Sequence, residues 1–148
     1  MKYQELVEEY LKKDLFELHN IQEVCLYSLK SSLNKLSENM NFDPSKAYFI
    51  YMMLCVGCDK VCDDKEYELL HKFINPNVTI KMVNDFLPEF LASDNSLTFV
   101  REIILAVKSM SEVAYEEMIK IALCFVCANK DFSEEKKTFI ETIMIEVE

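Results

Sequence analysis

Apolar residues recur at steps of three and four along most of the chain, which is the spacing of one buried face of an α-helix. The first apolar stripe lies in residues 3–11, and a second begins at about Gln22 and ends near Met40. No segment alternates apolar and polar residues for long enough to predict a strand. The pattern therefore predicts an all-α chain of about eight helices. The remaining predicted helices cover residues 44–58, 64–74, 79–88, 97–107, 109–128 and 133–147.

Capping residues predict where several of these helices begin and end. Asp43 before Pro44 is typical of a helix start, because the Asp side chain accepts hydrogen bonds from free backbone N–H groups and proline fits the first turn. We expect Pro88 to end or kink its helix. Other predicted starts are Thr79, Ser133 and the capping-box pair Ser109 and Glu112.

One plan of apolar helix, acidic turn and amphipathic helix occurs twice, in residues 48–74 and again in residues 118–144. At an offset of 70 residues, Lys60 falls on Lys130 and Asp64 falls on Glu134. The first apolar segment, 44–58, is apolar nearly all round, so we expect it to be the central, fully surrounded helix. The sequence thus predicts two copies of one helix–acidic turn–helix unit within a compact helical domain.

Composition limits the class of protein and its partners. The 148 residues fit one domain, 1–148, in which two N-terminal helices (1–42) pack on a core of about residues 46–148. A net charge of −10 disfavours nucleic acid and anionic membrane surfaces, which leaves cations and proteins as partners. Without a signal-peptide pattern, the six cysteines indicate reduced thiols in the cytoplasm.

The first acidic turn has two interpretations. Asp59, Asp63 and Glu66 are close in sequence, and their carboxylates could bind a divalent cation such as Ca²⁺ or Mg²⁺. The turn fails the EF-hand pattern, because Asp64 and Leu70 stand where Gly and Glu are required. Alternatively, Asp63 caps the following helix and Glu66 completes a capping box, which we favour.

Two further kinds of site receive less support from the residues. The spacing of five cysteines could provide a zinc site. They fall inside apolar helices, however, where cysteine is an ordinary core residue. His19 and His71 show no spacing to a nucleophile, and the single glycine excludes most phosphate-binding loops. A metal-assisted hydrolase using the carboxylates is the weakest alternative. The cysteines concerned are Cys55, Cys58, Cys62, Cys124 and Cys127.

The two turns resemble those of the TerB-like family, which is associated with tellurite resistance and stress response in bacteria. Its members are all-helical and carry two copies of an apolar helix, an Asp-Gly turn and a helix that opens with a Glu. The pattern falls on residues 58–66 (CDKVCDDKE) and 128–136 (ANKDFSEEK), and the resemblance covers about Lys46 onward. Lys60 and Lys130 replace the family's glycines and cost roughly 1 kcal/mol each if the backbone there is left-handed.

The resemblance implies function and site residues that the spacing alone does not give. It implies a cytoplasmic, non-enzymatic binding or scaffold protein with a protein partner, in a stress-response setting. The alternative is a regulatory module that binds a divalent cation through Asp59, Asp63 and Glu66, of which the resemblance implies Asp59 and Glu66 as ligands, with Asp63 beside them. In the second copy, Asn129 and Lys136 replace the family's acidic residues, so we expect no second cation site.

Overall fold

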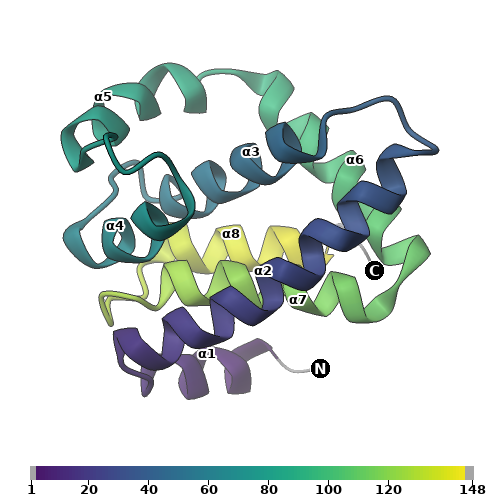
Figure 1. Cartoon of the computed structure of the whole chain (residues 1–148). Helices are drawn as coiled ribbons and strands as arrows, with labels where there is room; N and C mark the ends of the chain where they lie inside the picture. Colours follow the sequence, from purple (N-terminus) through teal and green to yellow (C-terminus); the bar gives the residue numbers. More distant parts are fainter. Residues whose placement is uncertain (1–2, 146–148) are drawn as a thin grey trace.

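The computed structural model describes residues 3–145, which form eight α-helices and one short 3-10 helix and contain no strand (Figure 1). This confirms the all-α prediction. No helix in this range has the length and the apolar character needed to cross a membrane. The elements in order are α1 (Tyr3–Leu11), α2 (Leu15–Ser37), α3 (Pro44–Val56), α4 (Asp64–Leu70), η1 (His71–Phe73), α5 (Ile80–Leu91), α6 (Asp94–Met110), α7 (Glu112–Val126) and α8 (Glu134–Ile145).

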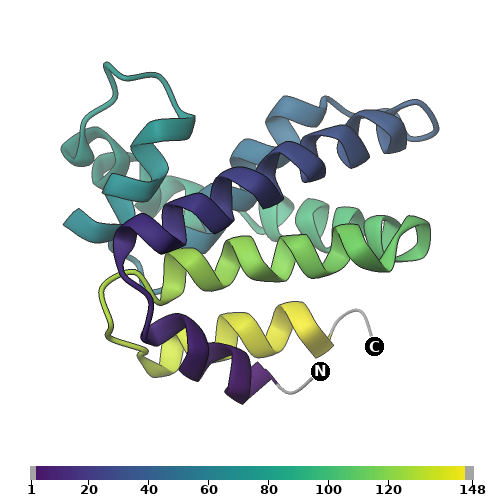
Figure 2. The ribbon, with the colours of Figure 1, turned by 60° about the horizontal axis from the view of Figure 1, so that its bottom comes forward.

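The central helix is α7, not the segment 44–58 as predicted. Helices α1, α2, α3, α4, α6 and α8 all contact α7, and α2 makes the most extensive contact. Figure 2 shows α7 running between α2 on one side and α1 and α8 on the other. Its side chains from Ile121 to Val126 are all fully buried. The prediction failed because α3 is equally apolar in sequence, and only the tertiary arrangement decides which apolar helix is enclosed.

Helix α3 is buried against α2, α6 and α7 but leaves one side open. Nine of its residues are buried, whereas Phe49 is 39% exposed. Helix α5 faces this open side from a distance, as Figure 1 shows. The apolar character of α3 therefore serves both the core and an open groove, which is described below.

The caps of three helices confirm their predicted starts. Asp43 accepts from Ser45 N, with Pro44 in the first turn of α3. Thr79 accepts from Met82 N at the start of α5. Ser133 Oγ accepts from the backbone N of residue 136 at the start of α8.

Three predicted boundaries were wrong. Helix α2 begins at Leu15 because Asp14 and Glu17 form a capping box there. Ser111, not Ser109, caps α7, because α6 continues to Met110. Helix α5 continues through Pro88 to Leu91, since burying apolar side chains on both sides of the proline favours the helix despite the missing N–H.

The single glycine, Gly57, is required by close packing and not by backbone conformation. Its φ is −97°, which any residue adopts. A Cβ at this position would lie 2.8 Å from Leu87 Cδ2 and 3.0 Å from the Met53 carbonyl oxygen. Gly57 therefore allows Leu87, which is fully buried, to pack α5 against the end of α3.

Candidate functional site

The two acidic turns share one set of backbone hydrogen bonds, displaced by 70 residues. In the first turn, Lys60 N donates to Gly57 O at 2.8 Å; in the second, Lys130 N donates to Cys127 O at 3.2 Å. Lys60 and Lys130 have φ values of 73° and 64°, so both lie in the left-handed region, which favours glycine. The cost expected for a lysine at these positions therefore applies.

Side-chain caps also recur at the same positions of the two turns. The Asp59 side chain accepts from Val61 N at 3.4 Å, and Asn129 Oδ1 accepts from Asp131 N at 3.0 Å. In the first turn Asp63 and Glu66 form a complete capping box, in which each side chain accepts from the other's backbone N–H. The capping interpretation of Asp63 and Glu66 is therefore confirmed.

Lys136 joins the two turns from inside the protein. Its side chain is fully buried, and its Nζ donates to Asn129 Oδ1 and to the Asp131 carbonyl oxygen, both at 3.0 Å. The same ammonium lies 3.8 Å from Asp59 Oδ2 in the first turn. Asn129 Nδ2 in turn donates to Asp63 Oδ2. We call these residues the inter-turn network: Asp59, Asp63, Glu66, Asn129 and Lys136.

Glu66 is the second fully buried ionisable side chain of the inter-turn network. Burial raises its pKa to about 9, and this effect outweighs the hydrogen bond from Asp63 N and the charge of Lys136, which lower it. At neutral pH the side chain is therefore a neutral acid. Within residues 3–145, its Oε2 has no hydrogen-bond partner.

The predicted cation ligands, Asp59, Asp63 and Glu66, do lie near one another, but their arrangement argues against a cation. The Lys136 ammonium already supplies positive charge beside Asp59, and both oxygens of Asp63 accept hydrogen bonds. In residues 3–145, no three His, Cys, Asp or Glu side chains form a group that could hold a metal ion. Their role as ligands stays a prediction that this geometry does not favour.

The cysteines are equally unsuited to zinc. All six are free thiols, and none is exposed. Burial raises the pKa of Cys58, Cys62 and Cys127 to about 12 in each case, and it raises that of Cys55 well above its ordinary value. In the described residues 3–145, the cysteines also form no group of three or more ligands, with one another or with His, Asp or Glu, that could hold a metal ion. The structure supports the interpretation of these cysteines as core residues.

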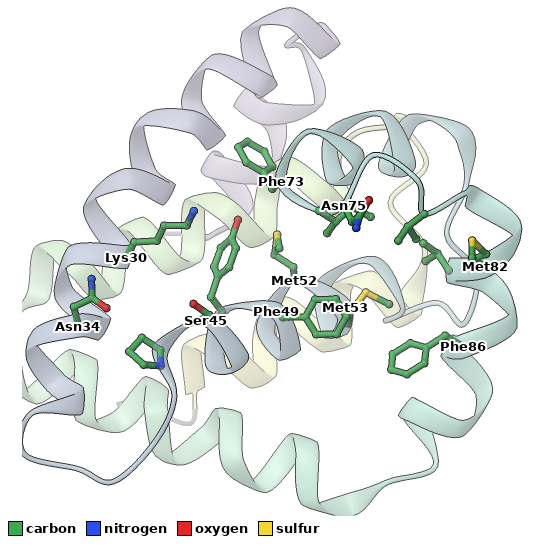
Figure 3. A pocket seen from close by; sticks show the side chains of 15 residues that line it. Lys30, Asn34, Ser45, Phe49, Met52, Met53, Phe73, Asn75, Met82 and Phe86 are labelled. Carbon is green, nitrogen blue, oxygen red and sulfur yellow. The ribbon is translucent and has the colours of Figure 1, made fainter.

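A groove between α3 and α5 is a further candidate binding site, and sequence reasoning missed it. It encloses about 600 Å³ between α2, α3, the segment 73–78 and α5. In Figure 3, Phe49 and Met53 line it from α3, and Met82 and Phe86 line it from α5. The Phe49 and Phe86 rings lie 6.3 Å apart, centre to centre, and so connect these two walls.

One end of the groove is polar. Lys30 and Asn34 of α2 lie there with Ser45, and Tyr48 also lines the groove (Figure 3). The Lys30 Nζ lies 5.3 Å from the centre of the Tyr48 ring, within the range of a cation–π contact. The groove thus combines a long apolar surface with an ammonium group at one end.

Comparisons with protein-family models, with curated proteins and with solved structures find no match to this chain. The candidate sites therefore rest on their geometry alone.

The sequence signal that could have revealed the groove was the all-round apolar character of residues 44–58. A helix that is apolar all round but is not central has one apolar side that the core does not cover, and another helix or a ligand must cover it.

Proposed function

We propose that this chain is a non-enzymatic binding protein that takes an apolar ligand in the groove between α2, α3 and α5. The groove itself is the observation that supports this. Its volume of about 600 Å³ is typical of small-molecule sites, which are concave, mainly apolar and contain a few placed polar groups. The ligand is a small molecule, because the groove is a hollow of that size and not an extended flat surface.

Exposed apolar side chains at the groove also favour ligand binding. Phe49, Met82 and Phe86 are 39%, 54% and 42% exposed, although each lies at the groove wall. Covering such surface with an apolar molecule removes it from water, which is favourable in proportion to the area buried. A ligand in the groove would complete the apolar environment of α3 that the sequence predicts.

The wider assignment rests on the resemblance to the TerB-like family. An all-helical fold and left-handed backbone at Lys60 and Lys130 support a TerB-like type. On that basis the protein would work in the bacterial cytoplasm, in a stress-response setting. The six free cysteines are consistent with a reducing compartment.

The test is saturable binding of an uncharged apolar probe, N-phenyl-1-naphthylamine, whose fluorescence rises in an apolar site. Ser45 is exposed at the mouth of the groove, and the side chain that caps α3 is that of Asp43, so Ser45→Trp should obstruct the groove without unfolding the chain. Val113→Trp, at an exposed position on α7 and outside the groove, is the matched control. Excitation above the absorption band of Trp keeps the introduced residue out of the signal.

We expect the wild-type protein and Val113→Trp to bind one probe molecule with equal affinity, and Ser45→Trp to bind at least about tenfold more weakly, which is roughly 1.4 kcal/mol. Absence of saturable binding to the wild type, or equal binding by both Trp variants, would overturn the proposal.

The cation-binding alternative has its own test. A cation that binds only the folded state must raise the melting temperature. We expect millimolar Mg²⁺, Ca²⁺, Mn²⁺ and Zn²⁺ to leave it unchanged, because Lys136 already neutralises charge at Asp59. A rise that disappears in Asp59→Asn would establish the cation module instead.

A further inference from the structure

We propose, on the basis of the groove as the binding site, that its ligand is a straight-chain carboxylate of the fatty-acid class. The carboxylate would bind at the polar end, where it would accept hydrogen bonds from the Lys30 ammonium and the Tyr48 hydroxyl. The alkyl chain would lie along the Phe and Met side chains of α3 and α5.

The Tyr48 hydroxyl is the first observation that points to such a ligand. Tyr48 is only 6% exposed, and within residues 3–145 its hydroxyl has no hydrogen-bond partner. A buried hydroxyl without a partner is unfavourable, since it has lost its hydrogen bonds to water. Burial also raises the pKa of Tyr48, so the phenol keeps its proton and can donate. A ligand acceptor in the groove would satisfy this donor.

The charge distribution is the second observation. The chain has 26 acidic residues and a net charge of −10, yet no Asp or Glu of the described chain lines the groove. Lys30 is the single charged residue among those lining it. In Figure 3 its side chain projects from α2 over the opening, towards the α3 side. The only charge that the groove offers a ligand is therefore positive, which selects an anionic head group.

The rest of the lining suits an alkyl chain. Met52 and Met53 of α3 face Met82 of α5 across the groove, and Phe73 closes the side nearest η1 (Figure 3). Methionine side chains are flexible and polarisable, so they adapt to a chain that can bend. A long apolar surface with one cationic end matches a molecule with one anionic end and a long apolar tail.

The experiment compares decanoate with decanol, which has the same chain and no charge, as competitors for bound N-phenyl-1-naphthylamine at neutral pH, below their aggregation limits. Lys30→Met removes the ammonium and Tyr48→Phe removes only the hydroxyl. Lys35→Met is the matched control, because Lys35 is exposed on the same helix and does not line the groove.

We expect decanoate to displace the probe at about one tenth of the decanol concentration, since a charge-assisted hydrogen bond is worth about that factor. Lys30→Met should abolish this preference by weakening decanoate alone, Tyr48→Phe should reduce it several-fold, and Lys35→Met should keep it. Probe binding itself should be unchanged in Lys35→Met, which lies outside the groove. Within Lys30→Met and Tyr48→Phe, decanoate and decanol are compared against the same bound probe, so a change in probe affinity does not alter their ratio.

The possible failures are distinguishable. If the probe binds but decanol competes as well as decanoate, or if the preference survives Lys30→Met, the carboxylate is excluded and the groove remains a site for apolar molecules. If an acidic amphipathic peptide displaces the probe and neither decanoate nor decanol does, the groove docks a protein and this inference is wrong. If the probe does not bind the wild type, the proposed function fails as well.

Discussion

Replacing Lys136 with methionine should remove the ammonium that joins the two acidic turns while conserving the shape of the side chain. Methionine is similar in length to lysine without its terminal ammonium, so the substitution leaves little empty space. It does remove the donor to Asn129 Oδ1 and to the Asp131 carbonyl oxygen, and the cation near Asp59. The effect therefore reports on the polar interactions and not on packing.

The expected size of the effect follows from these contacts. Two hydrogen bonds from a charged group contribute roughly 1.5–3 kcal/mol each, and the loss of the ion pair to Asp59 adds to this. Avoiding the burial of an ammonium offsets part of the sum. Breaking one partner of a buried ionic group generally costs about 3–5 kcal/mol, which we expect here. That is a large part of the roughly 5–15 kcal/mol that stabilises a typical domain.

Urea unfolding followed by circular dichroism gives the free energy of unfolding for both proteins. Lys137→Met is the matched control, because Lys137 is the adjacent lysine and is exposed. We expect the control to change the free energy by less than about 0.5 kcal/mol. Adding Asp59→Asn to Lys136→Met should restore about 1 kcal/mol, since it removes a carboxylate that has lost its cation.

A change of less than about 1 kcal/mol in Lys136→Met, similar to that of the control, would refute this description of the inter-turn network. The same conclusion would follow if Asp59→Asn destabilised Lys136→Met as much as it destabilises the wild type. In either case Lys136 would not be the cation that holds the two turns together.

Three other changes test separate features. Because the pKa of Glu66 is raised to about 9, the folded chain holds a proton that the unfolded chain releases above its ordinary pKa of about 4.5. The free energy of unfolding should therefore fall as pH rises from about 4.5 to 9, by up to about 1.4 kcal/mol per pH unit. Glu66→Gln should flatten that slope in urea unfolding and Glu68→Gln should not; identical slopes would contradict the buried neutral acid. Gly57→Ala should destabilise by about 1–3 kcal/mol, since its Cβ would clash with Leu87, and unchanged stability would disprove the close approach. Lys60→Gly should stabilise by about 1 kcal/mol by relieving the left-handed backbone, and a loss of melting temperature would contradict this.

Local signals in the sequence predicted the helices well where a cap was present. Asp43, Thr79 and Ser133 all begin helices as expected, because a capping side chain acts on the backbone within three residues. The start of α2 was wrong although Asp14 and Glu17 have the capping-box spacing. At Pro88 the local preference was overridden by burial of Leu87 and its neighbours, which the sequence alone does not reveal.

The candidate sites, like the helix boundaries, were predictable only where the interacting residues lie close together in the sequence. The capping box of Asp63 and Glu66 was predictable, because both partners lie on one turn. The burial of Lys136 against the other turn was not, although its alignment with Glu66 at the 70-residue offset did place a cation opposite an acid. The groove depends on where α5 lies relative to α3, and no short-range pattern gives that distance.

The central claim, that the groove is the binding site, can be tested most directly with NMR of protein labelled with ¹³C at the methionine methyl groups. Met52, Met53 and Met82 line the groove, whereas Met118 is buried in α7, outside it. On titration with decanoate, we predict that the three groove methyl signals shift together and saturate while the Met118 signal stays in place. Unchanged groove signals, or shifts of Met118 as large as theirs, would contradict the account.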